Sequence, residues 1–162
     1  SFPTRRSSDL GIGADDRAGC AILWQLREMG HSLLITNGEE RGCVGARAIR
    51  QLNPELYEEL NCHSYMLEFD RRNAKDYKVY DIPVTSEFKS FIESETGFSE
   101  PDNLSSTDIR VLCWYICGAN LSVGYNYEHT ELEYLVFEDW QNTLNIARKL
   151  LAKPQRPFLL LP

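Results

Sequence analysis

The sequence predicts an α/β fold in three layers, α/β/α, around a mixed and mostly parallel sheet. Two observations lead to this prediction. Apolar runs of helical length alternate with short apolar runs of strand length. Acidic residues stand just after the strand-like runs, where open α/β sheets place their ligands. The chain has 162 residues, enough for one domain with a buried core, and it contains no internal repeat or linker.

The first expected helix covers about residues 17–29, where the apolar run AGCAILWQL is closed by a glycine. A buried strand is expected over residues 32–37, with Leu33, Leu34 and Ile35 at its centre. The elements that follow are helices over residues 43–52 and 54–60 and a strand over residues 64–69. The two strands would bring the acidic residues that follow them to one edge of the sheet.

The second half of the chain predicts shorter elements. They are, in order, a strand over residues 78–81, a helix over 86–95, an irregular segment over 97–106, a strand over 121–124, a loop over 125–129 and a helix over 131–149. The last helix has one apolar face, formed by Leu132, Leu135, Val136, Trp140, Leu144, Ala147 and Leu151. A face of this kind is typical of a helix that packs on a sheet.

Composition excludes some classes of partner. The net charge is −7 and the pI is near 5.0, so charge favours neither nucleic acid nor an anionic membrane surface. No apolar run approaches the roughly 20 residues that span a bilayer, so no membrane segment is expected. The five cysteines have no zinc-finger spacing, and their odd number is typical of free thiols in a reducing compartment, which favours the cytoplasm.

Acidic and imidazole side chains occur in four short motifs. Asp15 lies in GADDRAG, Glu39 and Glu40 form a pair after the strand at 32–37, Asp70 lies in EFDRRN, and His129 lies in YNYEHTE. A two-metal hydrolase needs one bridging carboxylate, terminal carboxylate and imidazole ligands, and a further carboxylate as base. The four motifs supply most of these groups.

In this order, the motifs resemble the catalytic domain of the co-catalytic zinc aminopeptidases (peptidase family M28), over about residues 11–153. The resemblance implies two zinc ions, with Asp15 as the bridging ligand and Glu39 as the general base. Glu40 and His129 would complete one zinc site, and Asp70 would belong to the other. It also implies a cis peptide bond between Asp15 and Asp16.

The family's remaining ligand is a His in an HxD motif upstream of the bridging Asp, and no His precedes Asp15 here. Residues 1–10, SFPTRRSSDL, resemble a translated sequencing adapter, so we expect an artefact segment there. Residues 11–162 would then be an N-terminally truncated catalytic domain that lacks its first strands. We expect at most one tight zinc site, at Asp15, Glu40 and His129, and weak activity or none.

The resemblance implies a metallopeptidase, most specifically an aminopeptidase acting on a peptide or amino-acyl substrate. An amidohydrolase or deacylase, a carboxypeptidase and a non-catalytic binding relative remain open alternatives. Asp108, in SSTDI, stands where relatives carry a segment that lines the specificity pocket. Tyr125, close to His129 in sequence, is a second candidate for contact with the substrate.

Overall fold

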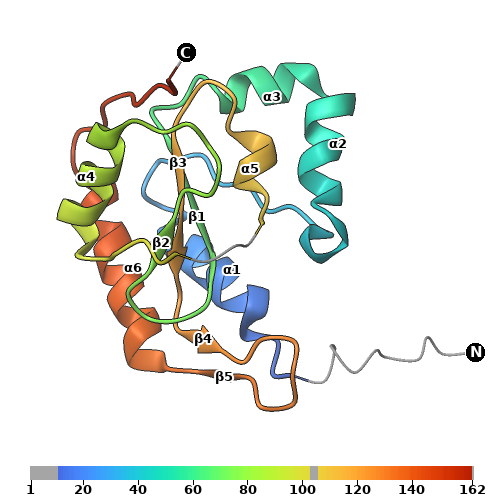
Figure 1. The fold of residues 1–162 in the computed structure, drawn as a ribbon, viewed down its shortest axis with the longest axis vertical. Helices are drawn as coiled ribbons and strands as arrows, with labels where there is room; N and C mark the ends of the chain where they lie inside the picture. The colour runs from blue at the N-terminus through green and yellow to red at the C-terminus, as the bar shows by residue number, and fades with distance from the viewer. Residues whose placement is uncertain (1–10, 103–105, 162) are drawn as a thin grey trace, which may run out of the picture.

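The computed structural model describes residues 11–102 and 106–161. It shows a mixed α/β fold in which helices surround a small mixed sheet (Figure 1). The expectation of an artefact segment over residues 1–10 lies outside the described residues.

Three strands form the main sheet, in the order β1-β3-β2. β1 (Met66–Arg71) runs parallel to β3 (Gly118–Ser122), and β2 (Tyr77–Lys78) runs antiparallel to it. All five residues of β3 are buried, as expected for a central strand. The strands at residues 64–69 and 121–124 were therefore predicted within a few residues, and the central one begins earlier than expected. β1 lies at the edge of this sheet, so one side of its backbone faces away from β3.

Helix α1 (Ala14–Leu26) packs directly against β1. The contact depends on Gly19, where a Cβ atom would lie only 1.9 Å from the backbone oxygen of Phe69. Ile22 and Leu26 continue the buried face one and two turns later. This close packing fixes the start of α1, and with it Asp15, beside the end of β1.

Helices α4 (Ser86–Thr96) and α6 (Phe137–Leu151) pack against each other at one side of the molecule (Figure 1). The Trp140 indole of α6 donates a hydrogen bond to the backbone oxygen of Ala18 in α1, at 2.9 Å. The buried residues of α6 are Trp140, Thr143, Leu144, Ala147 and Leu150. The helix thus has the apolar face that its sequence predicts, but it begins later than expected.

Residues 131–136 were predicted to be helical, and this prediction was wrong. Tyr134–Leu135 forms strand β5, which pairs with β4 (Tyr125–Asn126) in a two-stranded antiparallel sheet. The backbone N–H of Val136 also donates to Gly124, so hydrogen bonding across the hairpin replaces the first helical turns. Leu132, assigned to the apolar face, is 73% exposed.

Helices α2 (Val44–Leu52) and α3 (Pro54–Leu60) confirm the helices predicted there. They pack near α5 (Ile109–Leu112), a single helical turn that the sequence analysis did not predict. Cys43, Ala46, Val111 and Leu112 form a small second core between these helices.

The strand expected over residues 32–37 is absent, and Leu33 and Ile35 are 41% and 65% exposed. A strand needs a hydrogen-bonded neighbour, and within the described ranges this segment is separated from β1 by a large cavity. It instead links α1 to η2 (Glu39–Arg41), a short 3₁₀ turn. The apolar pattern of residues 32–37 is typical of a strand, but among the described residues no strand lies beside this segment to pair with it.

All five cysteines are free, as their number and spacing predict. No helix in the described part of the chain is long and apolar enough to cross a membrane.

Candidate metal centre

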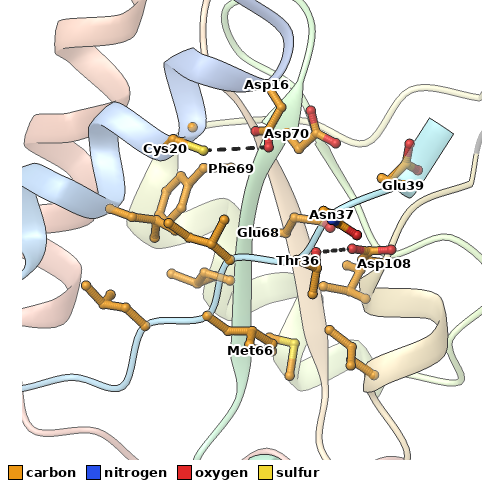
Figure 2. A pocket seen from close by; sticks show the side chains of 18 of the residues that line it. Asp16, Cys20, Thr36, Asn37, Glu39, Met66, Glu68, Phe69, Asp70 and Asp108 are labelled. Atoms are coloured by element: carbon orange, nitrogen blue, oxygen red, sulfur yellow. Dashed lines mark hydrogen bonds between the residues drawn. The ribbon is translucent and has the colours of Figure 1, made fainter. Parts of the chain in front are cut away.

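A cavity of about 1500 Å³ opens between α1, the segment at residues 32–38 and β1. Its wall is apolar near Leu26, Leu34 and Leu67 and acidic at the carboxyl end of β1. Figure 2 shows Asp16 and Asp70 at this end, with Glu39, Glu68 and Asp108 gathered around residues 36–39. The acidic and imidazole side chains that the sequence analysis selected therefore line one cavity, whereas Tyr125 does not.

Asp15 is held at the start of α1 by a buried carboxylate. Glu133, 7% exposed, accepts hydrogen bonds from the backbone N–H groups of Gly13 at 2.7 Å and Asp15 at 2.9 Å. A Cβ atom at Gly11 would collide with this carboxylate, at 2.1 Å from its Oε2. The Asp15–Asp16 peptide bond is cis, as the resemblance implies. Glu133 is a supporting residue that the sequence analysis missed, because its partner lies 118 residues away.

Asp15, Glu40 and His129 form the outer cluster. Nε2 of His129 lies 2.9 Å from Oδ2 of Asp15 and contacts Oε1 of Glu40. One ligand atom from each residue lies within 4.8 Å of the others. Burial works against protonation of the imidazole, but the negative charges of Glu40 and Asp15 raise the pKa of His129. In this structure the imidazole lies between two carboxylates.

Asp70 lies next to the outer cluster, within β1. Its backbone N–H donates to Oδ1 of Asn120 at 2.9 Å, and Nδ2 of Asn120 donates to the Asp70 carbonyl at 2.7 Å. The Tyr125 hydroxyl donates to Oδ1 of Asp70 at 3.2 Å. Burial, together with the charges of Asp16 and Asp15, raises the pKa of Asp70 to about 8. Asn120 fixes this side of the site, and nothing in the local sequence indicated that role.

Tyr125 was predicted to contact a substrate. It is 5% exposed, does not line the cavity, and has its hydroxyl directed at Asp70. In the structure it orients a candidate ligand residue.

Glu39 and Glu40 begin the 3₁₀ turn η2. Gly38 and Gly42 flank the turn with φ of 73° and 86°, a backbone conformation that favours glycine. The turn directs Glu40 to His129 and leaves Glu39 half-buried in the cavity wall. Burial, followed by the charge of Glu40, raises the pKa of Glu39 to about 7. A carboxyl group with a pKa near neutrality is suited to general acid–base catalysis.

Asp16 and Asp108 complete the acidic end of the cavity. Burial and the neighbouring Asp15 raise the pKa of Asp16 to about 6. Asp108 is 4% exposed and accepts a hydrogen bond from the Thr36 hydroxyl. The adjacent Glu68, in the middle of β1, accepts from Thr107 at 2.9 Å. Glu68 was not predicted as a site residue. The sequence did contain a sign of this role. Glu68 stands two residues before Asp70, and residues at this spacing in a strand point to the same face of the sheet.

The outer cluster has the donors that a divalent metal ion requires. Two carboxylate oxygens and one imidazole nitrogen converge, a set suited to zinc, with a further position left for water. Within the described residues it is the one group of at least three such side chains that converges in this way. Asp70 lies beside Asp15 but contributes to no second group of this kind. The structure thus brings Asp15, Glu40 and His129 into one possible metal-binding cluster, and the expected zinc site stays a prediction.

No protein-family model matches this chain, and comparisons with curated proteins and with solved structures find no significant match.

Proposed function

We propose that this chain is a zinc-dependent amide hydrolase of the co-catalytic aminopeptidase type. The observation that carries the proposal is the convergence of Asp15, Glu40 and His129 at one end of a large cavity, with Glu39 next to Glu40 in sequence. Asp15, Glu40 and His129 would hold the ion. A zinc ion held there supplies Lewis-acid chemistry, because it lowers the pKa of a bound water and polarises a carbonyl group.

Glu39 has the position and the proton affinity of a general base. It adjoins Glu40 in the cavity wall, and its pKa of about 7 lets it take a proton from water and return it near neutral pH. The proton would pass to the amine that leaves when the amide bond breaks. Glu133 and Asn120 would keep the surrounding carboxylates in place.

A second zinc ion is the finer part of the proposal. Asp70, together with Asp15, would hold this second ion. The Asp70 carboxyl group interacts with that of Asp15, and burial and the charges of Asp16 and Asp15 raise the pKa of Asp70. A second cation beside these acids would offset their mutual repulsion. With the ligands present in the described residues, we expect this second site to be weaker.

A three-layer α/β/α arrangement belongs to the same proposal. The cavity separates the exposed edge of β1 from the apolar segment at residues 32–37, and both present strand-like sequences to it. A further strand that paired with the edge of β1 in this space would extend the sheet. It would also cover Leu33 and Ile35, which would then be buried. The cavity next to an unpaired strand edge supports this larger sheet.

The test is hydrolysis of leucyl-glycinamide by the zinc-loaded protein, measured as release of free leucine. We expect slow hydrolysis that is abolished both by Glu39→Gln and by His129→Ala. The Glu58→Gln variant, altered at an exposed position of α3, should be unchanged. Equal rates for Glu39→Gln and the unaltered protein, or absence of both hydrolysis and zinc binding, would contradict the proposal. Hydrolysis of N-acetyl-leucine instead of the dipeptide amide would favour the deacylase alternative.

A further inference from the structure

The cavity wall contains a second group of acids, here called the inner acidic group: Glu39, Glu68 and Asp108. They come from three elements, η2, β1 and the start of α5, and Figure 2 shows them around residues 36–39. Glu39 is the proposed base. Glu68 and Asp108, here called the buried acid pair, have no part in the proposed reaction.

One oxygen atom of each acid in the buried acid pair has no hydrogen-bond partner among the described residues. These atoms are Oε2 of Glu68 and Oδ1 of Asp108, and Asp108 as a whole is only 4% exposed. The companion oxygens accept hydrogen bonds from the hydroxyls of Thr107 and Thr36. A carboxylate oxygen that is removed from water without a donor costs free energy, so these two atoms indicate a donor that binds there.

No cation of the protein pairs with the buried acid pair within the described residues. None of the ion pairs that Lys, Arg or His form there involves Glu68 or Asp108. The thiol of Cys43 interacts with Asp108, but a thiol is a weak donor and carries no positive charge. Burial, followed by the negative charge of Asp70, raises the pKa of Glu68. A ligand that fits this place therefore brings both donors and a positive charge.

The geometry of the pair narrows the kind of cation. Glu68 and Asp108 belong to no converging group of three or more metal-ligating side chains among the described residues, which disfavours a metal ion. An ammonium group directs its donors from a single nitrogen atom. A guanidinium group carries five N–H donors on three nitrogen atoms in one plane, so it can donate to two separate carboxylates at once. It is also more weakly hydrated than an ammonium group, which favours it at buried acceptors.

The cavity wall changes from acidic to apolar at the buried acid pair. Asp70, Glu68 and Met66 alternate along β1 and so point to the same face of the sheet, in this order from its carboxyl end. Met66 and Leu34 line the cavity and pack on the small second core. The pair thus lies between the candidate metal centre and an apolar wall, where the charged end of a long side chain would meet its last acceptors.

We propose that Glu68 and Asp108 bind the guanidinium group of an arginine side chain in the substrate. This role in a substrate rests on the proposed function. Burial and the charges of Glu40 and Asp108 raise the pKa of Glu39, so Asp108 lies within electrostatic range of the proposed base. An arginine that reaches the pair therefore has its main chain on the side of the candidate metal centre. The pair favours arginine over a neutral side chain of the same shape.

Binding to the metal-free protein at pH 7, measured by isothermal titration calorimetry, tests the assignment without zinc or turnover. Three probes share a blocked, neutral main chain: Nα-acetyl-L-argininamide, Nα-acetyl-L-lysinamide and Nα-acetyl-L-citrullinamide, in which a neutral urea replaces the guanidinium group. We expect the arginine probe to bind roughly tenfold more tightly than either of the others. Absence of binding by the arginine probe, or equal binding of the citrulline or the lysine probe, would overturn the assignment.

Substitutions locate the guanidinium group. Asp108→Asn keeps an acceptor for the Thr36 hydroxyl but removes the charge, so it should weaken binding of the arginine probe by roughly tenfold and leave the citrulline probe unaffected. Glu68→Gln should act in the same direction and provides the answer if Asp108→Asn does not fold, as judged by circular dichroism. Glu58→Gln, at an exposed position of α3, is the control and should match the unaltered protein. An undiminished preference for arginine in the folded variants would refute the assignment.

A separate zinc titration distinguishes this assignment from the proposed function. Asp108→Asn should retain the zinc affinity of the unaltered protein, because Asp108 is not part of the outer cluster. If the preference for arginine is present but zinc does not bind, the proposed function fails and the guanidinium site stands. If zinc binds but the preference for arginine is absent, the guanidinium site fails and the proposed function stands.

Discussion

The outer cluster and the inner acidic group lie in the wall of one cavity, yet they balance charge differently. In the outer cluster, the imidazole of His129 lies between the carboxylates of Asp15 and Glu40. The inner acidic group, Glu39, Glu68 and Asp108, meets the hydroxyls of Thr36 and Thr107 and the thiol of Cys43, and two of its buried oxygens have no hydrogen-bond partner among the described residues. One group thus pairs its carboxylates with an imidazole, whereas the other leaves buried acid oxygens without a partner among the described residues.

The largest expected effect concerns Glu39, which adjoins both groups. Glu39→Gln should lower the hydrolysis rate by roughly 100- to 10,000-fold, because it removes the base while keeping the shape of the side chain. Zinc affinity, measured by calorimetry, should stay within about threefold of the unaltered value, because Glu39 is outside the converging set. A parallel loss of zinc binding would mean that Glu39 is a ligand and that the two groups are not separate.

Stability should depend on pH in the direction set by the buried acids. The pKa values of Asp16, Glu39 and Asp70 are raised to about 6, 7 and 8, so the folded protein binds protons more tightly than the unfolded chain does. This stabilisation is complete below about pH 4 and is lost as the pH rises to about 8.

Urea denaturation at pH 5 and pH 8.5 measures the effect, and the free energy of unfolding should be lower at pH 8.5. Asp70→Asn should reduce the difference in the free energy of unfolding between pH 5 and pH 8.5, because it removes the acid with the highest of the three pKa values. Zinc added at pH 8.5 should restore part of the lost stability through the outer cluster. Stability that rises from pH 5 to pH 8.5 would contradict the assignment of these acids as buried and mutually repelling.

A smaller effect is expected from Glu133, which anchors only the outer cluster. In Glu133→Gln an amide N–H₂ would face one of the backbone N–H groups of Gly13 and Asp15. Zinc affinity should fall by about 10- to 100-fold, as is usual when a residue that supports a metal ligand is altered. An unchanged zinc affinity in this variant would show that Glu133 does not keep Asp15 in place.

The smallest expected effect concerns the packing of α1 against β1, away from the acidic side chains of the site. Gly19→Ala should destabilise the protein by about 1–3 kcal/mol, because the added methyl group would push α1 away from the Phe69 carbonyl in β1. Ala21→Ser, at an exposed position of the same helix, is the control and should change stability by less than about 0.5 kcal/mol. Thermal unfolding measures both. A neutral Gly19→Ala would mean that α1 and β1 are not in close contact.

Local sequence patterns predicted the helices α2, α3 and α4 because their apolar spacing and boundary residues lie within each segment. The same reasoning was wrong at residues 32–37 and 131–136. A strand at 32–37 needs a partner that the described residues do not provide beside it, and pairing of β5 with β4 prevents a helix at 131–136.

The candidate site was predictable to the extent that its residues lie in short motifs of a recognisable order. Asp15, Glu39, Glu40, Asp70 and His129 were selected by order and motif, and the structure brings Asp15, Glu40 and His129 into one converging set. Glu133, Asn120 and Glu68 were missed, because their roles depend on partners 118, 50 and 39 residues away. Hydrogen bonds between distant segments leave no periodic pattern in a single sequence.

The central claim is that Asp15, Glu40 and His129 bind a divalent cation. Calorimetric titration of the metal-free protein with zinc at pH 7, beside the His129→Ala variant, tests it most directly. We predict one tight site per chain in the unaltered protein and a loss of roughly 100-fold or more in affinity in the variant. Absence of a tight site, or a tight site that survives His129→Ala, would contradict the claim.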